Sequence, residues 1–154
     1  MNIKKITAEN YYQFDDMVYR RMHGREREDS DYIISDEIRC ELSNDNLYMY
    51  GVELNFKMIG WISLIYMPKV GKYNGRGHIY VDELWIEPTY RGKGYSKVLM
   101  DKADELCLRL NALGIRLYVS QDNVSAKCLY ENCGYNYSGQ SLFMTKEIVY
   151  KCKI

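Results

Sequence analysis

Two cations and two glycines alternate in the segment RGKG, residues 91–94. The segment separates a β-rich apolar run from a stretch with helical periodicity. A glycine turn at the start of a helix exposes that helix's first backbone N–H groups, and the positive end of the helix dipole adds to their attraction for an anion. Gly92 and Gly94 let the backbone turn tightly and approach a ligand, while Arg91 and Lys93 add charge at the rim. These residues indicate a phosphate site, with a plain tight connection as an equally weighted alternative.

Two common phosphate loops are excluded by their spacing. The pattern GxxxxGK[ST] is absent from the chain. The pattern GxGxxG also fails, because Lys97 stands where the third glycine is required. The segment therefore belongs to neither of these nucleotide-binding classes.

The strand expected before the loop, residues 78–86 (HIYVDELWI), contains two adjacent carboxylates. Its apolar residues slip by one position halfway along the alternation: Ile79, Val81, Leu84 and Ile86. A β-bulge at Asp82–Glu83 would produce this slip, leave backbone groups unpaired and aim both carboxylates toward the glycine loop. A strand buried on both faces would give the same pattern.

A third segment, residues 121–135 (QDNVSAKCLYENCGY), predicts a short helix that begins at Asn123 and ends at Gly134. Ala126 and Tyr130 are four residues apart and share one helix face. That face would look toward the glycine loop if the two strand–helix units lie side by side. A tyrosine on an inner face is more often part of the core than a catalyst.

The elements that must position these residues follow from periodicity and turn signals. The expected strands are 2–7, 46–54, 57–67, 78–86, 115–120 and 142–150, and the expected helices are 8–22 with Thr7 as cap, 32–43, the stretch after the loop up to Gly114, and 123–134. Asn55–Phe56 would turn an antiparallel hairpin. The order β-α-α-β-β-β-α-β-α-β-β predicts an α/β or α+β domain with a mixed sheet.

Composition limits the possible partners. The 154 residues predict one domain over 1–154, and a formal net charge of +0 favours neither nucleic acid nor an anionic membrane. We expect a cytoplasmic protein, because no apolar run suggests a signal peptide or a membrane span. Five irregularly spaced cysteines and two histidines form no metal pattern, so we expect reduced thiols and no metal.

Taken together, the three motifs resemble the GNAT superfamily of acyl-CoA-dependent N-acetyltransferases. Its loop signature corresponds to Arg91-Gly92-Lys93-Gly94-Tyr95-Ser96, with Ser96 in place of the usual small apolar residue. Its second signature corresponds to Asn123, Ala126, Tyr130 and Gly134-Tyr135. The joint match runs from about residue 80 to 135. The resemblance implies a central, mostly antiparallel sheet flanked by helices, and acetyl-CoA as cosubstrate.

The resemblance also implies a role for each site residue. Backbone groups of the loop, Arg91, Gly92, Lys93, Gly94, Tyr95 and Ser96, would hold the pyrophosphate of coenzyme A. Trp85 and Ile86 would pair with the pantetheine arm like an added strand, an unpaired N–H at the bulge would face the thioester carbonyl, and Asn123 and Ser125 would contact the cofactor from across the cleft. Polyamine-type acetyltransferases resemble this sequence in carrying an acidic pair here, which implies Asp82, ahead of Glu83, as the base and Glu83 as a substrate contact. A sheet-edge carboxylate or a salt bridge is an equally weighted alternative for each. Tyr130 would protonate the leaving thiolate.

The acceptor remains open from the sequence. The leading interpretation is a primary amine of a small molecule, with a peptide or protein amine as the alternative and a non-catalytic acyl-CoA-binding module as an alternative of another class. The family's acceptor pocket would draw on residues 20–31, which mix arginines with carboxylates, although the charge pattern by itself favours a solvated surface run. A polyamine or aminoglycoside would favour net acidity there, and an acidic amino acid would favour the arginines. A homodimer is also compatible with the resemblance.

Overall fold

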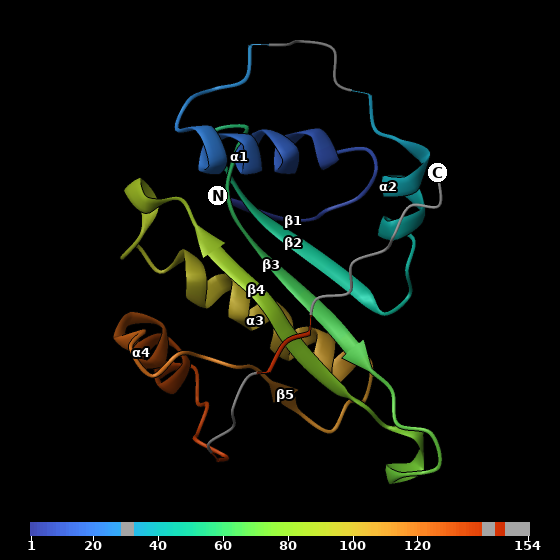
Figure 1. The fold of residues 1–154 in the computed structure, drawn as a ribbon. Helices are drawn as coiled ribbons and strands as arrows, with labels where there is room; N and C mark the ends of the chain where they lie inside the picture. The colour runs from blue at the N-terminus through green and yellow to red at the C-terminus, as the bar shows by residue number, and fades with distance from the viewer. Residues whose placement is uncertain (29–32, 140–143, 147–154) are drawn as a thin grey trace.

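A computed structural model describes residues 1–28, 33–139 and 144–146. Its elements follow the order β1 (Asn2–Lys5), α1 (Tyr11–His23), α2 (Asp36–Leu42), β2 (Leu47–Leu54), β3 (Lys57–Met67), β4 (His78–Ile86), α3 (Tyr95–Arg109), β5 (Ile115–Arg116) and α4 (Val124–Asn132). Short 3-10 turns lie at Tyr73–Gly75 and Pro88–Tyr90. Figure 1 shows α1 and α3 on opposite sides of a central sheet, with α4 beside α3. The predicted mixed α/β class is confirmed.

The sheet has the spatial order β1-β2-β3-β4-β5. Its first four strands are antiparallel neighbours, and β5 pairs parallel to β4 after the crossover through α3. Asn55 and Phe56 join β2 to β3 with φ values of 50° and 63°. Positive φ at both central residues matches the twist of a two-residue hairpin. The predicted hairpin is therefore confirmed.

The bulge predicted in β4 is present. Ser63 of β3 pairs with Glu83 and the next residue, Leu64, pairs with Val81, so Asp82 is the extra residue on β4. The slip keeps apolar side chains on the same face of β4 before and after it. It explains the broken alternation without requiring a strand buried on both faces.

Strand β5 is much shorter than the predicted 115–120. It pairs with β4 only at Ile79↔Ile115 and Tyr80↔Arg116, just before the bulge at Asp82. A bulge bends its strand, and beyond it β4 and residues 117–120 no longer pair. The far half of β4 is thereby left with an edge that no described strand covers.

Two apolar clusters hold the helices to the sheet. On the α3 face, Leu99, Met100, Ala103 and Leu106 pack against β2, β3 and β4, and Tyr130 of α4 packs at the margin of this cluster. On the opposite face, α1 packs against β3 and β4 through a second cluster, whose members include Phe14, Met17, Met58, Trp61 and Trp85.

Several predicted helix limits were wrong for local reasons. Helix α1 starts at Tyr11 instead of residue 8, because Asn10 folds back, accepting from the Thr7 N–H at 2.8 Å and donating to the Lys5 carbonyl at 2.9 Å. Thr7 is therefore not its cap. Helix α2 starts at Asp36, where Ser35 Oγ accepts from the Ile38 N–H at 3.3 Å.

Helix α3 also ends earlier than predicted. It stops at Arg109, and Asn111, at φ 49°, turns the chain before Leu113 and Gly114 are reached. Asparagine tolerates the left-handed conformation better than most residues. The predicted last strand, 142–150, lies largely outside the described residues. Within the part of the chain that is described, no helix is long and apolar enough to cross a membrane.

Candidate functional site

The glycine loop is an open turn at the start of α3. Gly92 and Gly94 have φ values of 73° and 84°, and a Cβ added at either position would meet no described atom within 4 Å. The glycines are therefore required by backbone conformation, and the space in front of them is open. The N–H groups of the first turn of α3 have no acceptor within the helix, because no helical turn precedes them.

The two cations of the loop are tied to its own backbone. Arg91 Nε donates to the Ile86 carbonyl at 2.9 Å, which fastens the loop to the end of β4. Lys93 Nζ donates to the Thr89 carbonyl at 3.2 Å and lies 5.2 Å from the centre of the Tyr90 ring. Both charges thus remain beside the turn and reinforce its attraction for an anion.

At the end of β4, the backbone groups of Trp85 and Ile86 point to opposite edges of the strand. The Glu87 N–H donates to the Ile59 carbonyl at 2.8 Å, across to β3. Because hydrogen-bonded and non-bonded pairs alternate along an antiparallel ladder, the backbone groups of Ile86 face the opposite, uncovered edge and those of Trp85 face β3. The Trp85 side chain lies on the α1 face of the sheet, in contact with the second cluster.

The structure brings Asp82 and Glu83 together at the bulge, where both are exposed. Glu83 Oε1 accepts from Arg21 Nη1 at 2.7 Å. Among the described residues, no ion pair engages Asp82. Its carboxylate is thus open to solvent at the point where β4 and β5 part.

Helix α4 carries the remaining predicted residues. Asn123 Oδ1 accepts from the Ala126 N–H at 3.1 Å, so this side chain caps the helix, and Ser125 in the first turn is exposed. Tyr130 is half-buried, 6.0 Å from the Tyr135 ring. Burial, with a smaller effect from Cys133, raises the pKa of Tyr130 above that of an ordinary tyrosine, which is itself protonated at neutral pH. No hydrogen bond links Tyr130 to either bulge carboxylate in the described structure.

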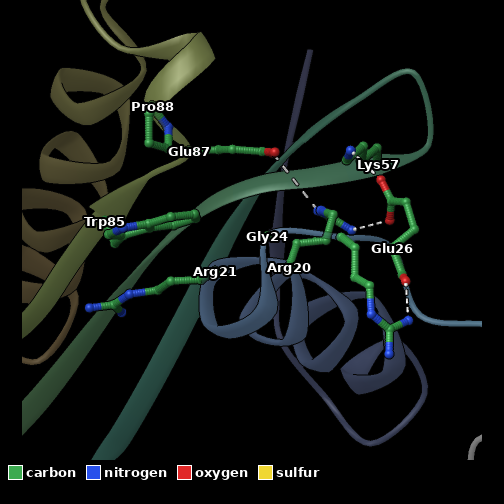
Figure 2. A pocket seen from close by; sticks show the side chains of 9 residues that line it. Arg20, Arg21, Gly24, Glu26, Lys57, Trp85, Glu87 and Pro88 are labelled. Atoms are coloured by element: carbon green, nitrogen blue, oxygen red, sulfur yellow. Dashed lines mark hydrogen bonds and ion pairs between the residues drawn. The ribbon is translucent and has the colours of Figure 1, made fainter.

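A cavity of about 550 Å³ opens on the α1 side of the sheet, at the end of β4. The described residues that line it are Arg20, Arg21, Gly24, Arg25, Glu26, Lys57, Trp85, Glu87 and Pro88, most of them labelled in Figure 2. The sequence analysis pointed to part of this cavity lining through the charged segment 20–31. Lys57 and Glu87 carried no signal, because only the fold brings the β2–β3 turn and the end of β4 to the end of α1.

Comparisons with known proteins point to one family of enzymes. The model of the acetyltransferase (GNAT) family matches residues 8–135. The streptothricin acetyltransferase of Escherichia coli is 31% identical over 116 residues, which are 75% of this chain and 60% of that enzyme. The spermine/spermidine N(1)-acetyltransferase of Bacillus subtilis (strain 168) is 24% identical over 153 residues, 98% of this chain and 97% of that enzyme. A solved aminoglycoside N-acetyltransferase in complex with CoA has a TM-score of 0.72 at 13% identity, covering 96% of this chain and 100% of that one.

Proposed function

The chain belongs to the GNAT family of acetyltransferases, and from this premise we propose that it transfers the acetyl group of acetyl-CoA to a primary amine of a small molecule. The observation that carries the proposal is the uncovered edge of β4, which runs from the bulge at Asp82 to the glycine turn. One ligand can lie along that edge, with a reactive end at the carboxylates and an anionic end at the helix start.

The loop fits the pyrophosphate of coenzyme A. Open space in front of Gly92 and Gly94 admits phosphate oxygens at the backbone, and the N–H groups of residues 92–96 are the donors we assign to them. Arg91 and Lys93 stay beside the turn and add positive charge. Acetyl-CoA, when bound, supplies an activated thioester for acyl transfer.

The pantetheine arm would lie along β4. The Ile86 N–H faces the uncovered edge, as an added strand requires, while the Ile86 carbonyl accepts from Arg91 Nε. Trp85 would separate this arm from the cavity on the α1 side. We place Asn123 and Ser125 on the opposite wall. The N-cap role of Asn123 leaves its amide nitrogen for a ligand, because only its oxygen is used by the helix.

The carboxylates of Asp82 and Glu83 would act on the protonated amine of the acceptor. An alkyl amine has a pKa near ~10.4 and is mostly protonated at pH 7, so it must lose a proton before it attacks. Asp82 is exposed at the bulge and is the proposed base, directly or through water. Glu83 would hold the acceptor's ammonium group. Tyr130, whose hydroxyl is protonated at neutral pH, would donate to the departing thiolate.

A thiol-release assay with acetyl-CoA tests this function. A panel of small primary amines should release CoA thiol, and lysine-containing and N-terminal peptides should release much less. Asp82→Asn should lower kcat about a hundredfold or more if it is the base. Faster release with peptides would favour the protein acetyltransferase, and acetyl-CoA binding without any release would favour the binding module. Either result would overturn the proposal.

A further inference from the structure

The cavity at the end of α1 has more positive than negative side chains. Among the described residues that line it, Arg20, Arg21, Arg25 and Lys57 are cationic, and Glu26 and Glu87 are anionic. The whole chain has 21 basic and 21 acidic residues. The excess of positive charge is therefore a local property of this cavity.

Half of the cations are neutralised inside the cavity. Arg20 Nη2 donates to the Met58 carbonyl at 2.7 Å and lies 3.9 Å from Glu87 Oε2, while its Nη1 lies 3.4 Å from Glu26 Oε2. Lys57 Nζ lies 2.8 Å from Glu26 Oε1. Only 11% of the Arg20 side chain is exposed. Figure 2 shows this network crossing the cavity from Glu87 to Glu26. Two cations and two carboxylates thus balance each other.

Arg21 and Arg25 supply the excess charge. Their partners, Glu83 and Glu28, are outside the cavity lining and are 45% and 89% exposed. Arg25 Nη1 lies 3.4 Å from both Glu28 Oε1 and the Glu26 carbonyl oxygen, and its guanidinium carbon lies 5.4 Å from the centre of the Tyr19 ring. Exposed ion pairs of this kind contribute little to stability and can be exchanged for a ligand. The cavity therefore favours the binding of a negatively charged group.

Arg21 lies beside two tryptophan rings and has unused donors. Its guanidinium carbon lies 5.3 Å and 5.4 Å from the ring centres of Trp61 and Trp85, which restrict its motion. Nη1 donates to Glu83, and among the described residues Nε and Nη2 have no acceptor. A guanidinium held in this way offers a planar pair of N–H groups that matches a carboxylate.

We propose that the acceptor is a small α-amino acid whose carboxylate is bound by Arg21, with the positive charge of Arg25 in the same cavity adding to the attraction. In an α-amino acid one carbon separates the amine from the carboxylate. Since Arg21 already contacts Glu83 at 2.7 Å, a carboxylate on Arg21 places the adjacent amine beside the bulge. Glu83 and Asp82 then meet the ammonium group, while the side chain of the acceptor lies toward Trp85 and the cavity.

This inference rests on the proposed acetyl transfer and restricts the class of acceptor to amino acids. A polyamine brings only positive charge, and it would meet two arginines whose charge no lining carboxylate offsets. A peptide N-terminus lacks a carboxylate next to its amine. The cavity therefore selects against both classes.

Paired acceptors test the inference. Phenylalanine is compared with phenethylamine and lysine with cadaverine, so that each pair differs by one carboxylate, and spermidine is included as a polyamine. The wild type should acetylate at least one amino acid with a kcat/KM at least about tenfold above that of its partner amine, the effect expected of one charged hydrogen-bond pair. Preference for cadaverine, phenethylamine or spermidine would overturn the inference while leaving acetyl transfer intact.

Arginine variants locate the effect. Arg21→Gln should lower the ratio of kcat/KM between amino acid and partner amine by about tenfold, and Arg25→Gln should lower it less, because only Arg21 is assigned to the carboxylate. Arg25→Gln leaves the Arg21–Glu83 pair in place, so its effect reports the charge of the cavity alone. Arg39→Gln, an exposed arginine on α2, is the control and should leave the ratio unchanged. An unchanged ratio in Arg21→Gln would refute the assigned contact.

A binding measurement keeps the two proposals separable. The chain's two tryptophans both lie beside Arg21, so their fluorescence reports on this cavity. In the presence of CoA, phenylalanine or lysine should change the emission and bind at least about tenfold more tightly than its partner amine. If no amine accepts acetyl but this preference holds, the acetyl-transfer proposal fails and the carboxylate site stands. If the preference is missing, the carboxylate site fails.

Discussion

The conformation of Gly94 yields a prediction with two separate readouts. Gly94 is the residue before α3 and has φ 84° and ψ −3°. A left-handed conformation costs a residue with a Cβ about 1–2 kcal/mol. An added methyl group would meet no described atom within 4 Å, so no steric clash adds to this strain. Gly94→Ala should therefore lower Tm by roughly 2–8 °C.

Gly71 is a matched control. Its φ is 67°, and a Cβ there would also meet no described atom within 4 Å, but it lies in the turn between β3 and β4, remote from the glycine loop in sequence. Gly71→Ala should carry a similar strain and a similar loss of Tm. The two variants therefore match in stability and differ in their relation to the proposed cofactor.

Calorimetric titration with CoA separates strain from recognition. A methyl group at residue 94 would keep phosphate oxygens away from the backbone N–H groups, and losing one charge-assisted hydrogen bond costs about 1.5–3 kcal/mol. We expect about a tenfold to hundredfold weaker Kd for Gly94→Ala and an unchanged Kd for Gly71→Ala. A loss of 1–2 kcal/mol from a typical stability of ~5–15 kcal/mol leaves the protein folded at 25 °C. A Gly94→Ala variant that bound CoA with wild-type affinity would refute the proposed phosphate site at the glycine loop.

Three further changes test other parts of the structure. Tyr130→Phe should lower kcat about tenfold to a hundredfold with little change in acetyl-CoA affinity, and unchanged kcat at saturating substrate would remove Tyr130 from the mechanism. Tyr135→Phe should raise the free energy of unfolding by about 1 kcal/mol in denaturant titrations, because the buried Tyr135 hydroxyl has no hydrogen-bond partner among the described residues. Glu53→Gln should lower that free energy by about 1–3 kcal/mol at pH 7, because Lys4 Nζ donates to the buried Glu53 at 2.6 Å. That hydrogen bond is the main cause that holds the pKa of Glu53 below its ordinary value, so its contribution is present above pH ~4.3 and is lost as the pH falls through the folded-state pKa. If the loss of unfolding free energy in Glu53→Gln were as large in acid as at pH 7, this role of the Lys4–Glu53 hydrogen bond would be contradicted.

The parts of the site that depend on local sequence were predictable. The slip in apolar alternation identified the bulge at Asp82, because a buried face forces the strand to keep its apolar residues inward. The left-handed glycines of the loop and the Asn123 cap follow from rules that involve a few neighbouring residues. Each of these features is decided within one turn or one strand.

The parts that depend on long-range pairing were not predictable. The length of β5 is set by where β4 bends away from it, so the β-rich composition of residues 115–120 was misleading. A second register shift lies between Val52 and Glu53 on β2. It left no break in the apolar pattern of the sequence, because the neighbouring residues of β3 are apolar on both faces of the sheet. The Arg21–Glu83 contact joins residues 62 positions apart, and only packing of α1 across the sheet reveals it.

Amide chemical shifts, measured while CoA is titrated into isotope-labelled protein, would show whether the glycine loop and β4 hold the cofactor. If the glycine turn and the uncovered edge of β4 hold the cofactor, the N–H signals of residues 92–96 and of Ile86 should shift most, in proportion to occupancy. Signals in the Tyr73–Gly75 turn should stay in place. Saturating CoA that leaves residues 92–96 unshifted, while signals elsewhere move, would contradict the account.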